Sequence, residues 1–310
     1  MEKSGQNRDP ADEKMQTSDL TLVIPAYNEE DSLRLFLPEL LDFCMKNGSQ
    51  LIIVDDCSKD GTGALIDKAA ASHEFMHVCH HKVNRGYGGA LISGLRLSQT
   101  RFSVTLDADG QHRLEDVLHL MEKQEECNAD LVIGSRSSDS GGGSGLYRAL
   151  GKKMIRGIAG LLVDDMEISD LNSGMKLYDT ELAQRYLKLC PDGMAFSEVM
   201  PLIFVQQKHL VAETPIEVAP RMSGKSTIST MTALDTLYQI INIVMVFNPM
   251  RIFLPIGGFM ILFGILWAIP FLIRGTGLST ASMMSMTAGL LLIMMGLLAE
   301  QLAQIRKKDL

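Results

Sequence analysis

The stretch "SVTLDADGQH", residues 103–112, begins like a buried strand and ends in two carboxylates separated by one residue. In an extended segment side chains repeat every two residues, so Asp107 and Asp109 are expected to point the same way, and Gln111 follows if the extension persists. Two like charges so close repel unless a cation lies between them. Oxygen ligands with an open coordination sphere suit Mg²⁺ or Mn²⁺, shared with substrate phosphates. The stretch therefore predicts a metal site of Asp107, Asp109 and Gln111; the alternative is a solvated Asp-rich turn.

Around this stretch, strand-like segments alternate with amphipathic helical patterns over residues 20–135. The expected strands are "LTLVIP", "LIIVDD", "MHVCHH", "FSVTLDAD" and "DLVIGS". The expected helices cover residues 31–46, 61–71, 88–97 and 114–127. This alternation predicts an α/β domain, Rossmann-like, with a mostly parallel sheet and helices on both faces.

Polar residues follow four of the expected strands: "PAYNEE" the first, "DDCSKDGT" the second, "DADGQH" the fourth and "GSR" the fifth. Any one of these segments is ordinary turn chemistry. Together they predict a site, because ligands bind beyond the carboxyl ends of parallel strands. The histidines of "HVCHH" alternate as in a strand and are interpreted as structural rather than metal-binding.

Two stretches that look like nucleotide-binding motifs each lack a required glycine. "NRGYGGALISG" has Leu91 where a dinucleotide-binding fingerprint needs its third glycine, and it follows the third strand. "GKST", residues 224–227, has Ala219 in place of the first glycine of a phosphate loop. Neither a dinucleotide fold nor a nucleotide triphosphatase is expected.

Composition excludes further classes. The net charge of −8 and pI near 5.4 argue against binding to nucleic acid, which requires a basic face. The five cysteines are scattered without a C-x-x-C pair, so neither a disulfide framework nor a zinc site is indicated, and a reducing compartment fits. Residues 1–18 have no apolar run, so they are expected to be a disordered tail and not a signal peptide.

Two uncharged apolar runs lie near the C-terminus, at about residues 252–273 and 278–299. The first would be about 33 Å long as a helix, against a hydrocarbon core of about 30 Å, so a transmembrane hairpin is expected over residues 251–310. Basic residues flank the pair (Arg251, and Arg306, Lys307 and Lys308 in the tail), whereas the turn has only Arg274. The positive-inside rule then places the preceding domain and both termini in the cytoplasm. The alternative is a buried hairpin in a soluble core.

The segment before the hairpin has a polar stripe opposite a broad apolar face, formed by Thr232, Asp235, Gln239 and Asn242. Residues 231–250 are therefore expected to form an amphipathic helix at the membrane interface, or alternatively a core helix of the preceding domain, residues 19–230. Gly289 and Gly296 lie seven residues apart on one face of the second apolar helix, for close packing that could support a homo-oligomer.

Six motifs occur in order: "VIPAYNEE", "IIVDDCSKDGT", "NRGYGGAL", "TLDADGQH", "VIGSR" and "DLNSGMKLY". With the two apolar runs, they resemble the family 2 glycosyltransferases of the GT-A fold. More narrowly, the chain is similar to the polyprenyl-phosphate glycosyltransferases, the group that contains dolichyl-phosphate mannose synthase and its bacterial relatives. The resemblance extends from Leu20 to the C-terminus.

The resemblance implies roles for particular residues. The pocket for the nucleotide base and ribose corresponds to Pro25, Tyr27 and Glu29 with Asp55 or Asp56, and Asp107 is also implied to bind the nucleotide. The metal and diphosphate site corresponds to Asp107, Asp109 and Gln111, with Arg136 near the donor phosphates and Arg148 as a second arginine. The glycine run at 137–145, between these arginines, is a mobile lid or a plain connector.

On the acceptor side, Asp170 and Asn172 match the segment beside the reacting sugar. The family's R-x-x-G-x-S element is matched by Arg221, Gly224 and Ser226. The lysine that usually follows this serine, implied as a ligand of the acceptor phosphate, is replaced by Thr227, and the nearest lysine, Lys225, lies two positions early.

The function implied is inverting transfer of one sugar from a UDP- or GDP-sugar to polyprenyl phosphate at the cytoplasmic membrane face. Asp170 is expected to orient groups rather than act as a base, because a phosphate monoester has a second pKa near 6 and is already largely a dianion. One alternative is a processive polysaccharide synthase, but the only tryptophan, Trp267, lies in the first apolar run and not in a Q-x-x-R-W element. The other is a non-catalytic membrane adaptor, although the metal motif is intact. No motif indicates which sugar is transferred.

Overall fold

The computed structural model describes residues 17–136, 168–219, 241, 244–245 and 248–308. The described residues fall into two compact units. The first comprises residues 17–136, 168–197 and 209–219, and the second comprises residues 198–208, 241, 244–245 and 248–308. Thr17 and Ser18, expected in the tail, form the 3₁₀ turn η1 (Thr17–Asp19). The predicted glycine run and most of the predicted interfacial helix lie outside the described residues.

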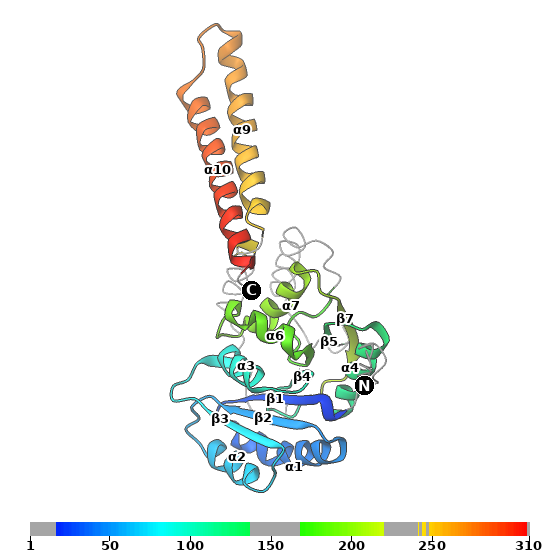
Figure 1. The fold of residues 1–310 in the computed structure, drawn as a ribbon. Helices are drawn as coiled ribbons and strands as arrows, with labels where there is room; N and C mark the ends of the chain where they lie inside the picture. Colours follow the sequence, from blue (N-terminus) through cyan, green and yellow to red (C-terminus); the bar gives the residue numbers. More distant parts are fainter. Residues whose placement is uncertain (1–16, 137–167, 220–240, 242–243, 246–247, 309–310) are drawn as a thin grey trace, which may run out of the picture. The chain divides into compact units, whose positions relative to one another are not determined.

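The first unit is built on one mixed sheet (Figure 1). Its described strands are β1 (Leu20–Ala26), β2 (Gln50–Asp55), β3 (Met76–His80), β4 (Phe102–Thr105), β5 (Leu131–Arg136), β6 (Lys176–Asp179) and β7 (Val211–Ile216). Their order in the sheet is β3-β2-β1-β4-β6-β5-β7. β6 is antiparallel to both neighbours, and the other pairs are parallel. The carboxyl ends of β1, β2, β4 and β5 therefore share one edge, as predicted.

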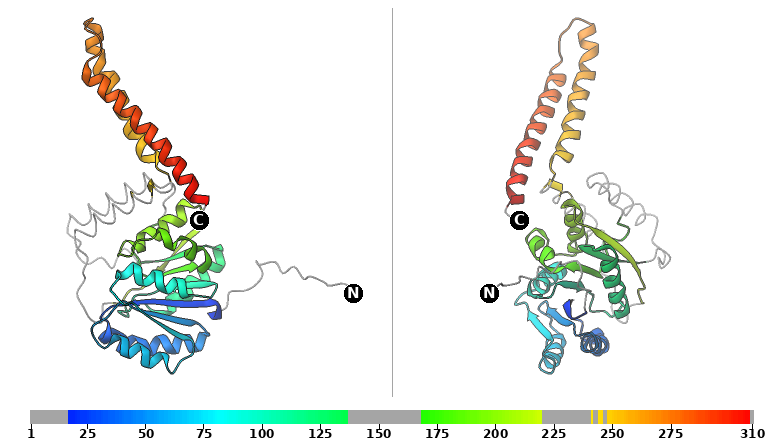
Figure 2. Two further views of the ribbon diagram at one scale, coloured as in Figure 1. Left: turned by 60° about the vertical axis from the view of Figure 1, so that its left-hand side comes forward. Right: turned by 45° about the vertical axis from the view of Figure 1, so that its right-hand side comes forward.

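The helices follow the predicted alternation. In this unit they are α1 (Glu30–Asn47), α2 (Thr62–Ala70), α3 (Gly86–Leu97), α4 (Leu114–Cys127), α6 (Thr180–Tyr186), the 3₁₀ helix η3 (Leu187–Leu189) and the start of α7 (Phe196–Gln206). α1 and α2 cover one face of the sheet and α3 covers the other (Figures 1 and 2). Every residue of β1 is buried, which explains why its sequence is almost continuously apolar.

Three details of the sheet differ from the prediction. β4 ends at Thr105 instead of Asp109, and the chain then turns at residues 108–110, where Gly110 adopts a left-handed φ of 68°. β6 and β7 were not predicted as strands. β6 is only four residues long and contains a lysine, and β7 contains Glu213 and Pro215, so neither has the β-branched pattern of the other strands.

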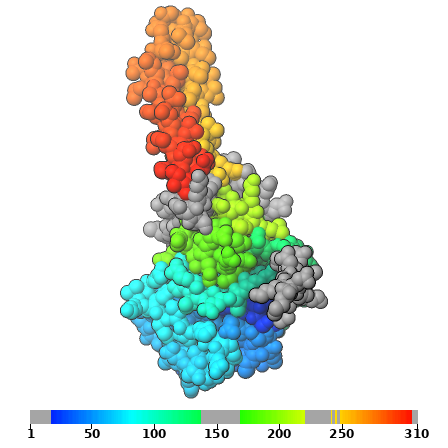
Figure 3. All heavy atoms as spheres, viewed as in Figure 1, coloured from blue at the N-terminus to red at the C-terminus, as the bar shows by residue number. Residues whose placement is uncertain are grey.

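The second unit contains the C-terminal hairpin, formed by α9 (Met250–Ile273) and α10 (Thr280–Lys308). The two helices run antiparallel side by side and form a continuous surface in the space-filling view (Figures 2 and 3). Met250–Ile273 and Thr280–Ile305 have mean hydropathies of 2.3 and 1.9 and are long and apolar enough to cross a membrane. Only 17% of each span is buried, which disfavours the alternative of a buried core hairpin.

Small residues set the packing of the hairpin. A Cβ at Gly257 would lie 2.8 Å from the carbonyl oxygen of Gly289, and one at Gly289 would lie 2.6 Å from that of Gly257. A Cβ at Gly296 would lie 2.6 Å from the Cβ of Phe253. The hydroxyl of Ser285 donates to the carbonyl of Met260 over 2.7 Å. The predicted close packing at Gly289 and Gly296 thus occurs within one chain, and a homo-oligomer stays a prediction.

Candidate active site

The two carboxylates of "DADGQH" lie in a tight turn directly after β4. The backbone N–H of Gln111 donates to Oδ1 of Asp109 over 3.2 Å, which closes the turn around Gly110. Asp109 is 9% exposed. Since β4 ends at Thr105, the period-two argument for the direction of Asp107 and Asp109 does not apply.

Asp107 is held from two sides. The hydroxyl of Tyr87, at the start of α3, donates to its Oδ1 over 2.9 Å. On the other side Gly174 lies so close that a Cβ there would be 2.4 Å from Oδ2 of Asp107. Burial is the main cause that raises the pKa of Tyr87 well above its ordinary value, and the Asp107 carboxylate is the second. The hydroxyl of Tyr87 therefore stays a donor. "NRGYGGAL" therefore serves the site by holding the first aspartate.

The turn is tied to the segment that follows β7. Nε2 of Gln111 donates to the carbonyl of Ala219 over 2.9 Å, and the N–H of Ala219 donates to the carbonyl of Gln111 over 2.9 Å. His112 forms a β-bridge with Val218. These contacts bring the end of the described segment, just before the predicted Arg221 element, to the metal motif.

Arg136 and Asp170 form a two-pronged ion pair. Nε of Arg136 lies 2.7 Å from Oδ2 of Asp170, and Nη2 lies 2.9 Å from Oδ1. The backbone N–H of Arg136 donates to the same Oδ2 over 3.3 Å. Burial alone would raise the pKa of Asp170, but the hydrogen bonds and charge of Arg136 outweigh it and hold this pKa below its ordinary value. Asp170 is therefore an ionised, hydrogen-bonded carboxylate.

Lys176 supports this pair from within the sheet. It is 1% exposed and lies between Thr105 of β4 and Ile133 of β5, and its Nζ donates to the carbonyl of Ser173. Its charge also lowers the pKa of Asp170. Asn172, in the same turn, is exposed.

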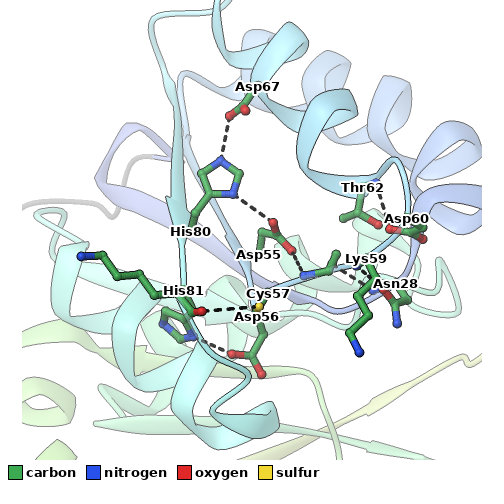
Figure 4. A network of polar contacts seen from close by, with 12 residues as sticks. Asn28, Asp55, Asp56, Cys57, Lys59, Asp60, Thr62, Asp67, His80 and His81 are labelled. Atoms are coloured by element: carbon green, nitrogen blue, oxygen red, sulfur yellow. Dashed lines mark hydrogen bonds and ion pairs between the residues drawn. The ribbon is translucent and has the colours of Figure 1, made fainter.

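The loops after β1 and β2 are joined by polar contacts (Figure 4). Asn28 has a left-handed φ of 54°, and its Oδ1 accepts from the N–H of Lys59 over 2.7 Å. Cys57 also has a left-handed φ, of 64°. Such strained residues persist where the surroundings hold them, often at ligand sites. Beside them Tyr27 is 43% exposed, whereas Pro25 is buried in β1.

The side chains of Glu29, Asp55 and Asp56 all have protein partners. Glu29 accepts from the hydroxyl of Ser32 over 2.8 Å. Asp55 accepts from the N–H of Ser58 over 2.9 Å and lies 2.9 Å from Nδ1 of His80. These three residues shape the ends of β1 and β2.

Asp56 organises the glycine loop before α3. Its carboxylate lies 2.6 Å from Nδ1 of His81 and accepts from the N–H groups of Arg85 and Gly86 over 2.8 and 2.7 Å. The predicted structural role of "HVCHH" fits these contacts, since His80 and His81 both bind aspartates (Figure 4).

The oxygen donors of Asp107 and Asp109 suit a divalent cation. Within the described part of the chain, no group of three or more His, Cys, Asp or Glu side chains is arranged to hold a metal ion. Mg²⁺ at phosphate sites is usually held by one or two carboxylates together with water and substrate phosphates. The predicted residues Arg148, Arg221, Lys225 and Ser226 lie outside the described residues.

Residues 21–187, over half of the sequence, match the family described as Glycosyl transferase family 2. The chain belongs to this family. Residues 248–305 match the GtrB C-terminal hairpin, which together with the two apolar helices supports membrane association of this transferase.

Curated relatives of this family 2 transferase include three polyprenyl-lipid enzymes. An undecaprenyl-phosphate mannosyltransferase of Micrococcus luteus is 34% identical, over 67% of this chain and 86% of the relative. A polyprenol monophosphomannose synthase of Mycolicibacterium smegmatis is 28% identical, over 76% of this chain and 90% of the relative. An undecaprenyl-phosphate 4-deoxy-4-formamido-L-arabinose transferase of Pseudomonas aeruginosa is 27% identical, over 92% and 85%.

Solved structures confirm the fold of the transferase. Mannosyl-3-phosphoglycerate synthase from Rubrobacter xylanophilus aligns with a TM-score of 0.55 and 19% identity, over 73% of this chain and 72% of that one. Glucosyl-3-phosphoglycerate synthase from Mycobacterium tuberculosis, in complex with Mn²⁺, UDP-glucose and phosphoglyceric acid, aligns with a TM-score of 0.55 and 16% identity, over 73% and 79%.

Three residues of the site were not predicted from the sequence: Tyr87, Lys176 and Glu213. Tyr87 and Lys176 lie inside two of the quoted motifs, but nothing in those motifs indicates that Tyr87 bonds Asp107 or that the charge of Lys176 acts on Asp170. Glu213 lies in an unpredicted strand, and its partners are more than forty residues away.

Proposed function

We propose that this glycosyltransferase moves a single sugar from a nucleotide diphosphate sugar to polyprenyl phosphate. The observation that carries the proposal is the pairing of two features in one chain. The Asp107–Asp109 turn and the Arg136–Asp170 pair lie on elements that end or start at one edge of the sheet, and the chain continues into an apolar hairpin. A very apolar acceptor must present its phosphate at a membrane surface, whereas a water-soluble acceptor would not require the hairpin. The relatives that act on undecaprenyl phosphate and polyprenol support this choice.

For the donor, we place the base and ribose at the ends of β1 and β2, beside the exposed ring of Tyr27. Pro25, Glu29, Asp55 and Asp56 form the wall of this pocket, and hydrogen bonds from Ser32, Ser58 and Gly86 to the three carboxylates keep its shape before the donor arrives. The donor is a UDP- or GDP-sugar.

The diphosphate lies between the metal motif and Arg136. Asp107, Asp109 and Gln111 would hold Mg²⁺ or Mn²⁺, and a cation bound there supplies Lewis-acid stabilisation of the leaving diphosphate. Arg136 adds hydrogen bonds from Nη1, which takes no part in the pairing with Asp170. Arg148, Arg221, Lys225 and Ser226 are further candidates for the phosphates of donor and acceptor.

In the reaction, a phosphate oxygen of the lipid attacks the anomeric carbon from the side opposite the diphosphate. The new bond joins that carbon to the lipid phosphate, the bond to the nucleoside diphosphate breaks with its electron pair, and the configuration inverts. No proton has to be removed, because the phosphate monoester is already largely dianionic at neutral pH. Asp170, paired with Arg136, therefore orients the site, and Asn172 lies beside the sugar and acceptor.

We further propose that the active site faces the cytoplasm. The basic residues near the ends of the hairpin, Arg251 and Arg306–Lys308, outnumber the single Arg274 of its turn.

The test is the mass of the lipid product. The full chain is incubated with UDP- or GDP-hexoses, Mg²⁺ or Mn²⁺, and polyprenyl phosphate, and the lipid extract is examined by mass spectrometry. A single hexose increment is expected. A ladder of increments would favour a processive synthase, and no lipid product from any donor would favour a non-catalytic adaptor.

A further inference from the structure

Glu213, on β7, lies opposite Ile133 of β5 and reaches the loop that leads into β6. Its Oε1 accepts from the backbone N–H of Ser169 over 2.8 Å and from that of Asp170 over 3.1 Å. Its Oε2 accepts from the hydroxyl of Ser169 over 2.8 Å. One carboxylate therefore fixes the backbone of two consecutive residues.

The second of these residues is the partner of Arg136. Because the backbone N–H of Asp170 is held by Glu213, the direction from which its carboxylate approaches Arg136 is set by β7. A second contact joins β5 to this loop, because the hydroxyls of Ser135 and Ser169 lie 2.8 Å apart. The side chain of Arg136 is 45% exposed, whereas that of Asp170 is 16% exposed. The more buried Asp170 therefore holds the arginine, while part of the guanidinium side chain faces solvent.

We infer that Glu213 is a positioning residue for the transferase reaction: it acts through Asp170 to hold Arg136 in place for the donor diphosphate. A carboxylate suits this task, because hydrogen bonds between backbone N–H groups and an ionised acceptor are stronger than neutral ones. Placing a second negative charge beside Asp170 is tolerated since Arg136 and Lys176 supply two positive charges. This inference rests on the proposed function.

A purely structural role for Glu213 makes a different prediction. If Glu213 only stabilised the contact between β7 and the loop, its substitution would weaken the binding of all ligands equally, through loss of folded protein. If Glu213 positions Arg136, its substitution should weaken the binding of a nucleoside diphosphate more than that of the monophosphate, because Arg136 contacts the diphosphate.

The experiment measures the affinity of the full chain, with Mg²⁺, for UDP or GDP, whichever the wild type binds more tightly, and for the matching monophosphate. In Glu213→Gln we expect affinity for the diphosphate to fall about tenfold and affinity for the monophosphate to change less than about twofold. The matched control is Glu181→Gln, which removes the same charge from an exposed position on α6. In an Arg136→Gln background, Glu213→Gln should cause little further loss, because coupled residues are not additive.

Equal weakening of diphosphate and monophosphate, or the same loss with and without Arg136, would overturn the inference. If Glu213→Gln does not fold, Glu213→Asp keeps the charge but shortens the reach to the two N–H groups, and it should show the same selective loss. Wild-type preference for the diphosphate in this variant would also overturn the inference. A wild type that binds neither diphosphate would contradict the proposed function itself, and the inference with it.

Discussion

The guanidinium of Arg136 and the carboxylate of Asp170 are locked in a two-pronged pair, with Nε to Oδ2 at 2.7 Å and Nη2 to Oδ1 at 2.9 Å. This relationship links the end of β5 to the loop before β6, and it decides the chemistry open to Asp170. A general base must accept a proton near the operating pH, but the pairing keeps the pKa of Asp170 below its ordinary value. Asp170 is thus better suited to orient Arg136.

Asp170→Asn tests this assignment. We expect a rate lower by about tenfold to a hundredfold, with the acidic limb of the pH–rate profile unchanged, because that limb belongs to the acceptor phosphate. The profile is measured for both proteins with donor and metal saturating. If the substitution removes an ionisation from the profile and alkaline pH restores the rate, Asp170 is the base.

Asp109→Asn tests the metal motif. The amide keeps the shape of the side chain but has no charge to hold a cation, so turnover should fall by about a hundredfold or more. EDTA should abolish wild-type turnover, and added Mg²⁺ or Mn²⁺ should restore it. Asp42→Asn, at an exposed pair on α1, is the control for charge. A rate close to wild type in Asp109→Asn would refute the assignment.

Gly174→Ala tests the close approach to Asp107. The added Cβ would lie 2.4 Å from Oδ2, so the carboxylate has to move and turnover should fall by about tenfold to a hundredfold. Gly193→Ala is the matched control, because a Cβ there meets no atom within 4 Å. Equal rates in the two variants would show that the position of Asp107 does not matter for turnover.

The contact between His80 and Asp55 predicts a pH window for stability. Hydrogen bonds with Asp67 and Asp55 raise the pKa of His80 above 6.5. The contribution of His80 to the stability of the fold is therefore complete below pH 6.5 and is lost as pH rises through the raised pKa. Burial raises the pKa of Asp55, but hydrogen bonds from Ser58 and His80 outweigh it and hold it below 3.8. Its contribution is complete above that pH and is lost as pH falls through the lowered pKa.

The difference in melting temperature between wild type and His80→Gln should therefore be largest from pH 3.8 to 6.5 and shrink on both sides. The matched control is His77→Gln, which changes an exposed histidine of the same strand. A difference that does not vary with pH would mean that His80 acts by packing and not by charge.

The sequence predicted the edge of the sheet that carries the site because it depends on local patterns. Strands such as β1 and β2 are continuous apolar runs, and their polar ends need only the rule for parallel strands. Glu213 could not be predicted in this way, since its hydrogen bonds to Ser169 and Asp170 depend on β7 lying beside β5. The direction of Asp107 was equally hidden, because it depends on Tyr87 and Gly174, which are brought together only by the fold.

Coupled release of the donor nucleotide tests most directly whether the acceptor is a phosphate on a polyprenyl chain. The full chain is given its preferred nucleotide sugar with polyprenyl phosphate, with the matching polyprenol, or with no lipid. We predict one nucleoside diphosphate released for each lipid-linked sugar formed, with polyprenyl phosphate only. Equal release with polyprenol, or without any lipid, would contradict the account.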